Sequence, residues 1–411
     1  MILFFLTSGL FLGWSLGAND ASNVFGSAVG SKMVSFRKAA IIASIFVIAG
    51  AVIQGAGASN TLGKLGAVNA IGGSFTLALA AAVTLYIMTK FSLPVSSTQA
   101  IVGAIIGWNF FTGNKTDPGT LSKIVGTWIS GPVIGALFSV FLYMLIIKIK
   151  KTFRIHLITF ESFIRTGLII AGAFGAYSLG ANNIANVMGV FVPAFNLENL
   201  DLGIFSLSSS QQLFLLGGIG IAVGIITYSK KVMETIGGNI IELSSEAALV
   251  VVLAQSLVLF IFSSTGLSDL FVRIGLPPIP LVPVSSSQVI IGCIIGIGLY
   301  KGARNINFRL LGQIAAGWIA TPVMSGILAF LSLFFIKNIF NIDVGHKIAE
   351  GISEPDITMA VADASMSVII KFLLLGIVIT GFFLILYFLM IERKKRRDLR
   401  LSEEKFWKNL K

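Results

Sequence analysis

Long apolar blocks separated by short polar segments dominate the chain. Several of them approach or exceed the roughly 20 residues that an α-helix needs to cross a bilayer. Such blocks must be helices, because lipid cannot satisfy exposed backbone N–H and C=O groups. The pattern therefore predicts an all-α integral membrane protein with many spans. The blocks are 41–54, 75–88, 133–147, 213–227, 247–262, 312–336 and 368–390.

Composition indicates the same class. Hydrophobic residues make up 55% of the 411 positions and charged residues 12%, whereas soluble domains carry about 25% charged residues. The net charge of +12 could suggest nucleic acid, but the lysines and arginines gather at the ends of the apolar blocks, as the positive-inside rule requires. We therefore expect membrane lipid, and no nucleic acid, as a partner. The single cysteine, Cys293, excludes an intramolecular disulfide.

Three blocks of the first half recur in the same order in the second half. They pair 15–26 with 178–189, 94–107 with 283–296, and 128–132 with 318–322. The second pair, which begins Pro-Val-Ser-Ser, is identical at 10 of 14 positions. An internal repeat of this kind predicts two structurally related halves.

The repeat and the charge clusters divide the chain into six segments. These are a first repeat (1–147), a basic cytoplasmic linker with an interfacial helix (148–165), a second repeat (166–337), an extracytoplasmic loop (338–365), a final transmembrane helix (366–390) and a basic cytoplasmic tail (391–411).

Basic clusters at 32–38, 148–154 and 393–397 give the orientation. They place the C-terminus in the cytoplasm and the N-terminus outside. The assignments fit together only if each Pro-Val-Ser-Ser segment is one arm of a re-entrant hairpin, at about 70–111 and 240–300. The fold predicted is therefore a polytopic helical transporter with two inverted-topology repeats, discontinuous helices and two re-entrant hairpins, a transporter signature that places binding at the midplane.

The first repeated motif, Gly-Ala-Asn-Asp-Ala-Ser-Asn at 17–23, puts a carboxylate and amides into an apolar stretch. A charge inside a membrane is costly and usually marks an ion or proton site. We expect Gly17 to let the helix unwind, and the side-chain oxygens to bind a small alkali cation. The alternative is hydrogen bonding between helices. The candidate cation ligands are Asn19, Asp20 and Asn23, with Asn182, Asn183 and Asn186 in the second copy.

The second repeated motif combines proline with hydroxyl residues at the expected start of a helix. Free N–H groups at a helix N-terminus, together with hydroxyls, form a ready anion site. We call the two helix starts, 94–99 and 283–288, the tips of the predicted hairpins. If the tips meet from opposite sides, they would bind a tetrahedral oxyanion without arginine or lysine. Capping of a membrane helix is the alternative. The hydroxyls concerned are Ser96, Ser97, Thr98, Ser285, Ser286 and Ser287.

The paired motifs resemble those of the inorganic phosphate transporter (PiT) family over most of the chain. The resemblance implies phosphate uptake coupled to Na⁺ or H⁺, alternating access around a central site, and in many members a homodimer. It adds Gln99 and Gln288 to the substrate and ion region. One departure matters, because the second motif often reads Gly-Ala-Asn-Asp in the family, whereas Asn183 stands here in place of the acid.

Several functions stay open at this point. We favour symport of inorganic phosphate with Na⁺ across the cell membrane, because amides do not titrate near pH 7 and suit a cation better than a proton relay. The alternatives are proton-coupled phosphate transport, symport of sulfate or another oxyanion, and a passive anion channel or receptor. We expect no enzyme activity and no cofactor other than Na⁺ as the coupling ion.

Overall fold

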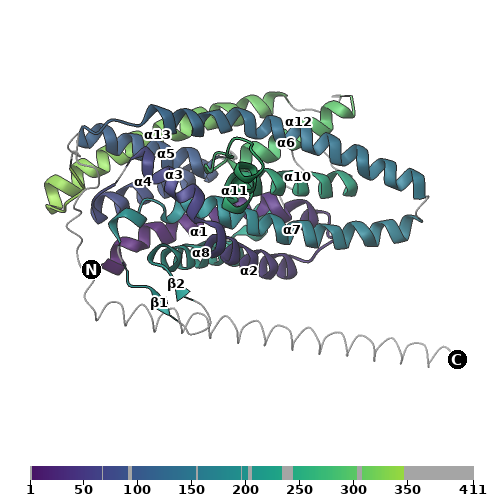
Figure 1. Cartoon of the computed structure of the whole chain (residues 1–411), viewed down its shortest axis with the longest axis horizontal. Coiled ribbons are helices and arrows are strands. Elements are labelled where there is room, and N and C mark those ends of the chain that lie inside the picture. The colour runs from purple at the N-terminus through teal and green to yellow at the C-terminus, as the bar shows by residue number, and fades with distance from the viewer. Residues whose placement is uncertain are drawn as a thin grey trace. The chain divides into compact units, whose positions relative to one another are not determined.

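The computed structural model of the chain is built from helices that follow one another along the sequence (Figure 1). It describes residues 2–66, 68–90, 95–153, 156–195, 197–201, 206–233, 244–302 and 308–346. The helices are α1 (Ile2–Gly30), α2 (Phe36–Gln54), α3 (Ala56–Leu65), α4 (Ile71–Lys90), α5 (Ser97–Thr112), α6 (Pro118–Phe153), α7 (Leu157–Met188), α8 (Ser209–Thr227), α10 (Ser245–Ser263), α11 (Thr265–Arg273), α12 (Ser286–Tyr300) and α13 (Phe308–Phe340). A short 3₁₀ turn, η1 (Val192–Ala194), follows α7.

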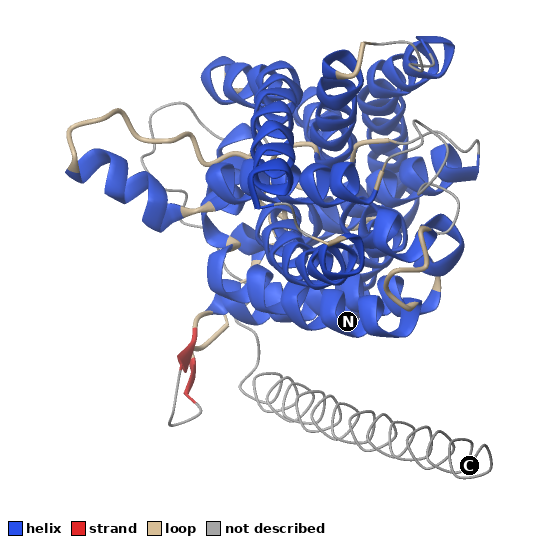
Figure 2. Ribbon diagram, turned by 90° about the vertical axis from the view of Figure 1, so that its right-hand side faces the viewer, coloured by secondary structure: helices blue, strands red, loops and turns tan. Residues whose placement is uncertain are grey.

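Strands β1 (Leu200–Asp201) and β2 (Ser206–Leu207) pair in a small two-stranded sheet, drawn red in Figure 2. The chain divides into two compact units. The larger one comprises residues 1–196 and 207–359 and holds all the helices named above. Of the smaller one, 197–206 with 360–411, the structure describes only 197–201 and 206. The predicted final helix (366–390) and basic tail (391–411) lie outside the described residues.

Seven of the described helices are long and apolar enough to cross a membrane. Two of them, α6 and α13, bury only a minor share of their apolar length inside the protein. Ile129 and Phe141 on α6, and Ile319 on α13, are each at least 65% exposed. Large apolar surfaces of this kind suit a lipid environment and would be a liability in water. The prediction of an all-α, multi-pass membrane protein is confirmed.

The predicted linker is not a separate interfacial helix in the described residues. Residues 148–153 form the last turns of α6, and 157–165 form the first turns of α7. The apolar pattern of each neighbouring span continues into the basic segment, so both helices extend to its middle. At the other boundary, α13 runs to Phe340, and the predicted loop (338–365) therefore begins three residues later than expected.

Both Pro-Val-Ser-Ser segments lead into helices, as predicted. Ser96 caps α5 by accepting a hydrogen bond from the Gln99 backbone N–H at 3.2 Å. Ser285 caps α12 in the same way through Gln288, at 3.3 Å. Helix α4 packs against α5, and α10 against α12, as the arms of a hairpin must. Since α4 and α10 are each long enough to cross a membrane, the re-entrant character of the hairpins and the inverted orientation of the halves stay predictions.

Helices that occupy equivalent positions in the two repeats pack against their neighbours in the same way. Helix α5 packs on α13 where Gly103 meets the backbone of Pro322, and α12 packs on α6 where Gly292 meets the backbone of Pro132. A Cβ atom at either glycine would overlap the proline carbonyl oxygen. Backbones that approach this closely are typical of helix packing inside membranes.

The expectation that Gly17 unwinds its helix is wrong. Helix α1 continues through the motif, as does α7 around Gly180. Both glycines instead permit close packing, because a Cβ at Gly17 would overlap the Ile221 carbonyl oxygen, and a Cβ at Gly180 that of Val47. The motif glycines therefore bring α8 against α1 and α2 against α7.

Candidate functional site

The two Asn motifs lie on α1 and α7, and their polar side chains point into the protein rather than toward its apolar exterior. Asp20 is 2% exposed and Asn182, Asn183 and Asn186 are fully buried. The hydroxyls and amides of both tips are buried as well. Polar groups buried in this way among membrane helices mark a functional site by default.

Asp20 joins the two halves of the chain. Its Oδ2 atom accepts hydrogen bonds from Asn183 Nδ2 on α7 at 3.0 Å and from Ser286 Oγ at the start of α12 at 2.9 Å. Its Oδ1 atom accepts from Asn19 Nδ2 at 3.1 Å. The structure thus brings three predicted cation ligands and one predicted tip hydroxyl into one cluster.

The position that departs from the PiT pattern is one of these donors. Asn183 donates its amide hydrogen to Asp20, whereas an ionised aspartate there would place a second negative charge about 3 Å from the first. Like charges at that separation repel strongly in a medium of low dielectric constant. Asparagine at this position therefore allows a single buried carboxylate to be fully hydrogen-bonded.

The last asparagine of each motif contacts the opposite half in an equivalent way. Asn23 Nδ2 lies 3.4 Å from Ser286 Oγ, and Asn186 Nδ2 lies 3.4 Å from Ser97 Oγ. These serines occupy the same position in the two Pro-Val-Ser-Ser copies. Asn186 also donates to Thr98 Oγ1 at 3.0 Å. Each motif therefore reaches the tip of the other half, while the shared anion site between the two tips stays a prediction.

Some predicted ligands are already occupied by the protein itself. The hydroxyls of Ser96 and Ser285 serve as helix caps, and capping is the alternative considered for this motif. The Asn182 side chain both donates to and accepts from the backbone of Val284, at 2.8 Å each. Asn182 therefore holds the second tip in place.

Three buried acceptor atoms in this region have no hydrogen-bond donor among the described residues. They are Asn186 Oδ1, Gln99 Oε1 and Gln288 Oε1. A buried acceptor left without a partner costs about 1–3 kcal/mol. Amide oxygens are hard ligands of the kind that alkali and alkaline-earth cations prefer. Each of these oxygens is therefore chemically able to bind a cation.

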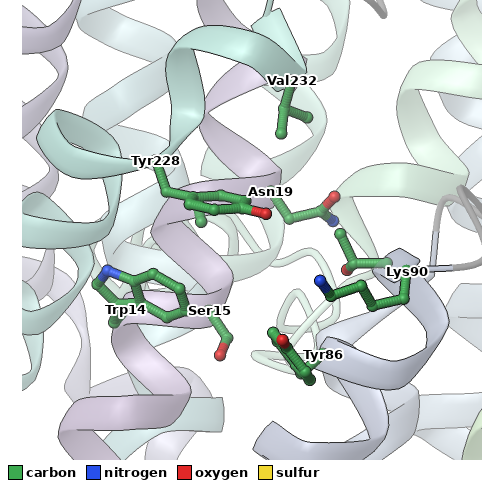
Figure 3. A pocket seen from close by; sticks show the side chains of 9 residues that line it. Trp14, Ser15, Asn19, Tyr86, Lys90, Tyr228 and Val232 are labelled. Carbon is green, nitrogen blue, oxygen red and sulfur yellow. The ribbon is translucent and has the colours of Figure 1, made fainter.

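A small pocket that is open to solvent reaches the site from one side. It is lined by Trp14, Ser15, Ala18, Asn19, Tyr86, Thr89, Lys90, Tyr228 and Val232 (Figure 3). Of these residues only Asn19 was predicted. The sequence does contain a feature that could have pointed to Lys90. Lys90 lies four residues before Pro94, and the equivalent position of the second repeat, four residues before Pro283, is the uncharged Ile279. A charge at one end of a single repeat breaks the symmetry of the two halves.

A family model described as the phosphate transporter family matches residues 16–329, and again 276–403. The chain belongs to the phosphate transporter family. This transporter is a multi-pass membrane protein and not an enzyme, as the sequence predicted.

The matches between this chain and similar proteins extend over nearly the whole length of those proteins. "Putative phosphate permease TK2061" of Thermococcus kodakarensis is 26% identical over 406 residues, covering 80% of this chain and 96% of the relative. A Haemophilus influenzae protein named "Putative phosphate permease" is 27% identical over 418 residues, covering 81% and 96%. The solved structure named "The sodium-dependent phosphate transporter" aligns with a TM-score of 0.63 at 22% identity, covering 82% of this chain and 99% of that one. That likeness shows the fold.

Proposed function

We propose that this transporter imports inorganic phosphate together with Na⁺, by alternating access to a site that both halves of the chain share. The observation that carries the proposal is the Asp20 carboxylate, which accepts hydrogen bonds from Asn183 of the second motif and Ser286 of the second tip. A carboxylate buried at the junction of two repeats, within reach of both motifs, is where a coupling cation would link their positions.

Phosphate would lie between the tips of α5 and α12. Each helix start carries roughly half a positive charge, and each tip adds hydroxyls that are not used for capping, such as Ser97 and Ser286. The buried Asp20 charge opposes an anion beside it. A cation bound at Asp20 removes this repulsion, so occupancy by Na⁺ would favour phosphate binding and account for coupling.

Na⁺ is favoured over H⁺ by the ligands around Asp20. The neighbouring side chains are amides, which do not take up protons near pH 7, and three amide oxygens lack donors among the described residues. The solved relative named as sodium-dependent supports the same choice by analogy. Transport driven by protons through Asp20 is the alternative that the experiment below separates.

The two motifs differ in their access to the pocket, and this difference supports the proposal of alternating access. Asn19 is partly exposed and lines the pocket, whereas its counterpart Asn182 is 0% exposed and bonded to Val284. One side of the site is thus open to a pocket while the equivalent position of the other repeat is closed. In the opposite state of the transport cycle we expect these roles to exchange.

The test is uptake of radiolabelled phosphate by proteoliposomes containing the full chain. At fixed pH and ionic strength, an inward Na⁺ gradient should drive accumulation above the external concentration, and replacement of Na⁺ by choline should abolish it. Excess unlabelled sulfate should compete poorly. Accumulation that persists in choline and follows a pH gradient would assign proton coupling, while efficient competition by sulfate would overturn phosphate as the preferred anion. Equilibration without accumulation would indicate a passive channel.

A further inference from the structure

We propose that Lys90, Tyr228 and Ser15 form a second oxyanion site in the pocket beside Asn19. Phosphate would bind there transiently on its way between the solvent and the central site. This inference rests on the proposed function and extends it to Lys90 and Tyr228, which lie outside the repeated blocks, together with Ser15 at the start of the first one. The ligand class is a phosphate oxyanion.

The first observation is the lining of the pocket. Lys90, the last residue of α4, is exposed, and among the described residues that line the pocket it alone is charged. No acidic side chain pairs with its ammonium group in the described part of the chain. Figure 3 shows the Lys90 amine reaching into the pocket between the rings of Tyr86 and Tyr228. Its Nζ atom lies 5.3 Å from the centre of the Tyr86 ring, a cation–π contact that holds the side chain over the pocket.

A second, independent observation comes from Ser15. This residue is 8% exposed, and its Oγ atom has no hydrogen-bond partner among the described residues, although it lines the pocket. A buried hydroxyl without a partner is costly unless a ligand or water completes it. An oxyanion would accept its hydrogen. Ser15 lies on α1, one helical turn before Asn19, so a ligand here lies on the way to the central site.

Contacts among the residues that line the pocket hold the proposed site in a fixed geometry. Trp14 Nε1 donates to Thr227 Oγ1 at 3.0 Å, and the Trp14 ring lies 5.4 Å from that of Tyr228. These contacts fix Tyr228, the residue after α8, against α1. Thr89 Oγ1 is already used by the Leu85 carbonyl at 2.7 Å. The polar groups left for an anion are therefore Lys90, Ser15 and the tyrosine hydroxyls.

Two sources could supply such an anion. Tryptophan, tyrosine and lysine together are also typical of the membrane interface, where a lipid phosphate could meet Lys90. Free phosphate is favoured because the pocket continues to Asn19, whose side chain is bonded to Asp20. A single positive charge in a concave pocket raises the local concentration of anions, which would increase the rate of exchange with the central site.

The experiment is chemical protection of Lys90 in the wild-type chain, followed by peptide mass spectrometry. The protein is placed in nanodiscs of zwitterionic lipid and treated briefly with an amine-acylating reagent, in inorganic phosphate or in chloride at matched ionic strength. We expect phosphate to slow acylation of Lys90 at least threefold. Lys64 is the matched control, because it is an exposed lysine on α3, which contributes no residue to the pocket, and its labelling should not change.

A variant separates the second site from the central one. Asp20→Asn removes the negative charge of the central cluster, and the protection of Lys90 should persist in this variant. Loss of protection in this variant, or no protection in the wild type, would overturn the inference. The experiment is repeated in nanodiscs that contain anionic lipid, where protection of Lys90 that does not change when phosphate is added would overturn the inference too, by identifying a headgroup site. The proposed function fails separately, if wild-type proteoliposomes take up no phosphate at all.

Transport kinetics give a second readout. Lys90→Gln should raise the KM for phosphate several-fold while leaving the maximal rate within about twofold of the wild type, and Lys90→Arg should restore the wild-type KM. Lys64→Gln should behave as wild type. Equal kinetics for Lys90→Gln and Lys64→Gln would contradict the inference.

Discussion

Ser286 Oγ donates a hydrogen bond to Asp20 Oδ2 over 2.9 Å, although 266 positions separate the two residues in the sequence. Asn183 donates to the same oxygen at 3.0 Å. Asp20 is thus held by the motif and by the tip of the second half. In the proposed alternating-access cycle, movement of one half relative to the other would lengthen or break these bonds and so couple the occupancy of Asp20 to the conformation of the transporter.

Asp20→Asn should abolish coupled uptake while leaving the protein folded. An amide oxygen can still accept the hydrogen bonds of Ser286 and Asn183, but it brings no charge to a cation. A loss of about 3 kcal/mol in cation binding, the upper end for one interaction with a charged group, corresponds to about 100-fold in rate. The measurement is initial uptake in proteoliposomes, with folding checked by thermal melting. Asp117→Asn, which removes an exposed acid before α6, is the control. A variant that concentrates phosphate at the wild-type rate would refute the role of Asp20.

Removal of a hydroxyl from either tip should weaken phosphate binding. Ser97→Ala and Ser286→Ala should each cost about 1–3 kcal/mol, the range for hydrogen bonds to charged groups. The Ser286 variant should lose more, because this hydroxyl also bonds to Asp20. Phosphate binding to the purified variants in Na⁺ measures both effects, with Ser122→Ala, an exposed position on α6, as the control. If the variant of one tip binds phosphate normally while the variant of the other tip does not, the two tips do not share the site.

Alanine at either motif glycine should disturb packing rather than ion binding directly. A Cβ at Gly17 or Gly180 would overlap a backbone carbonyl oxygen of the neighbouring helix, and separating the helices should destabilise the fold by about 1–3 kcal/mol. Gly126→Ala in α6 is the matched control, since a Cβ there meets nothing within 4 Å. The control should be neutral or slightly stabilising, because alanine is the better helix former. Equal melting temperatures for Gly17→Ala and Gly126→Ala would contradict the packing role.

The sequence carried enough information to predict the membrane class and the residues that meet at the centre. Apolar blocks of membrane length predict spans whatever their partners, and the resemblance to the PiT family implied that Asp20 and Ser286 belong to one region. The role of Gly17 could not be predicted, because a glycine that unwinds a helix and one that admits a neighbouring backbone look the same in sequence. Whether it meets Ile221 depends on how α8 packs.

Other features of the site depend on which helices become neighbours. Lys90 reads as the basic end of an apolar block, and nothing local links it to Ser15 or Tyr228, which come from α1 and the end of α8. Likewise, the hydroxyls of Ser96 and Ser97 are adjacent in sequence, yet one caps α5 and the other faces Asn186. The direction of each side chain at a helix start separates these roles, and this direction follows from tertiary structure.

The most direct test of the central claim is the simultaneous flux of ²²Na⁺ and ³²P-phosphate into the same proteoliposomes. Symport predicts that Na⁺ entry rises when phosphate is added, that phosphate entry rises when Na⁺ is added, and that Asp20→Asn removes both dependences. Phosphate entry that is undiminished when choline replaces Na⁺, with no phosphate-dependent entry of ²²Na⁺, would contradict it.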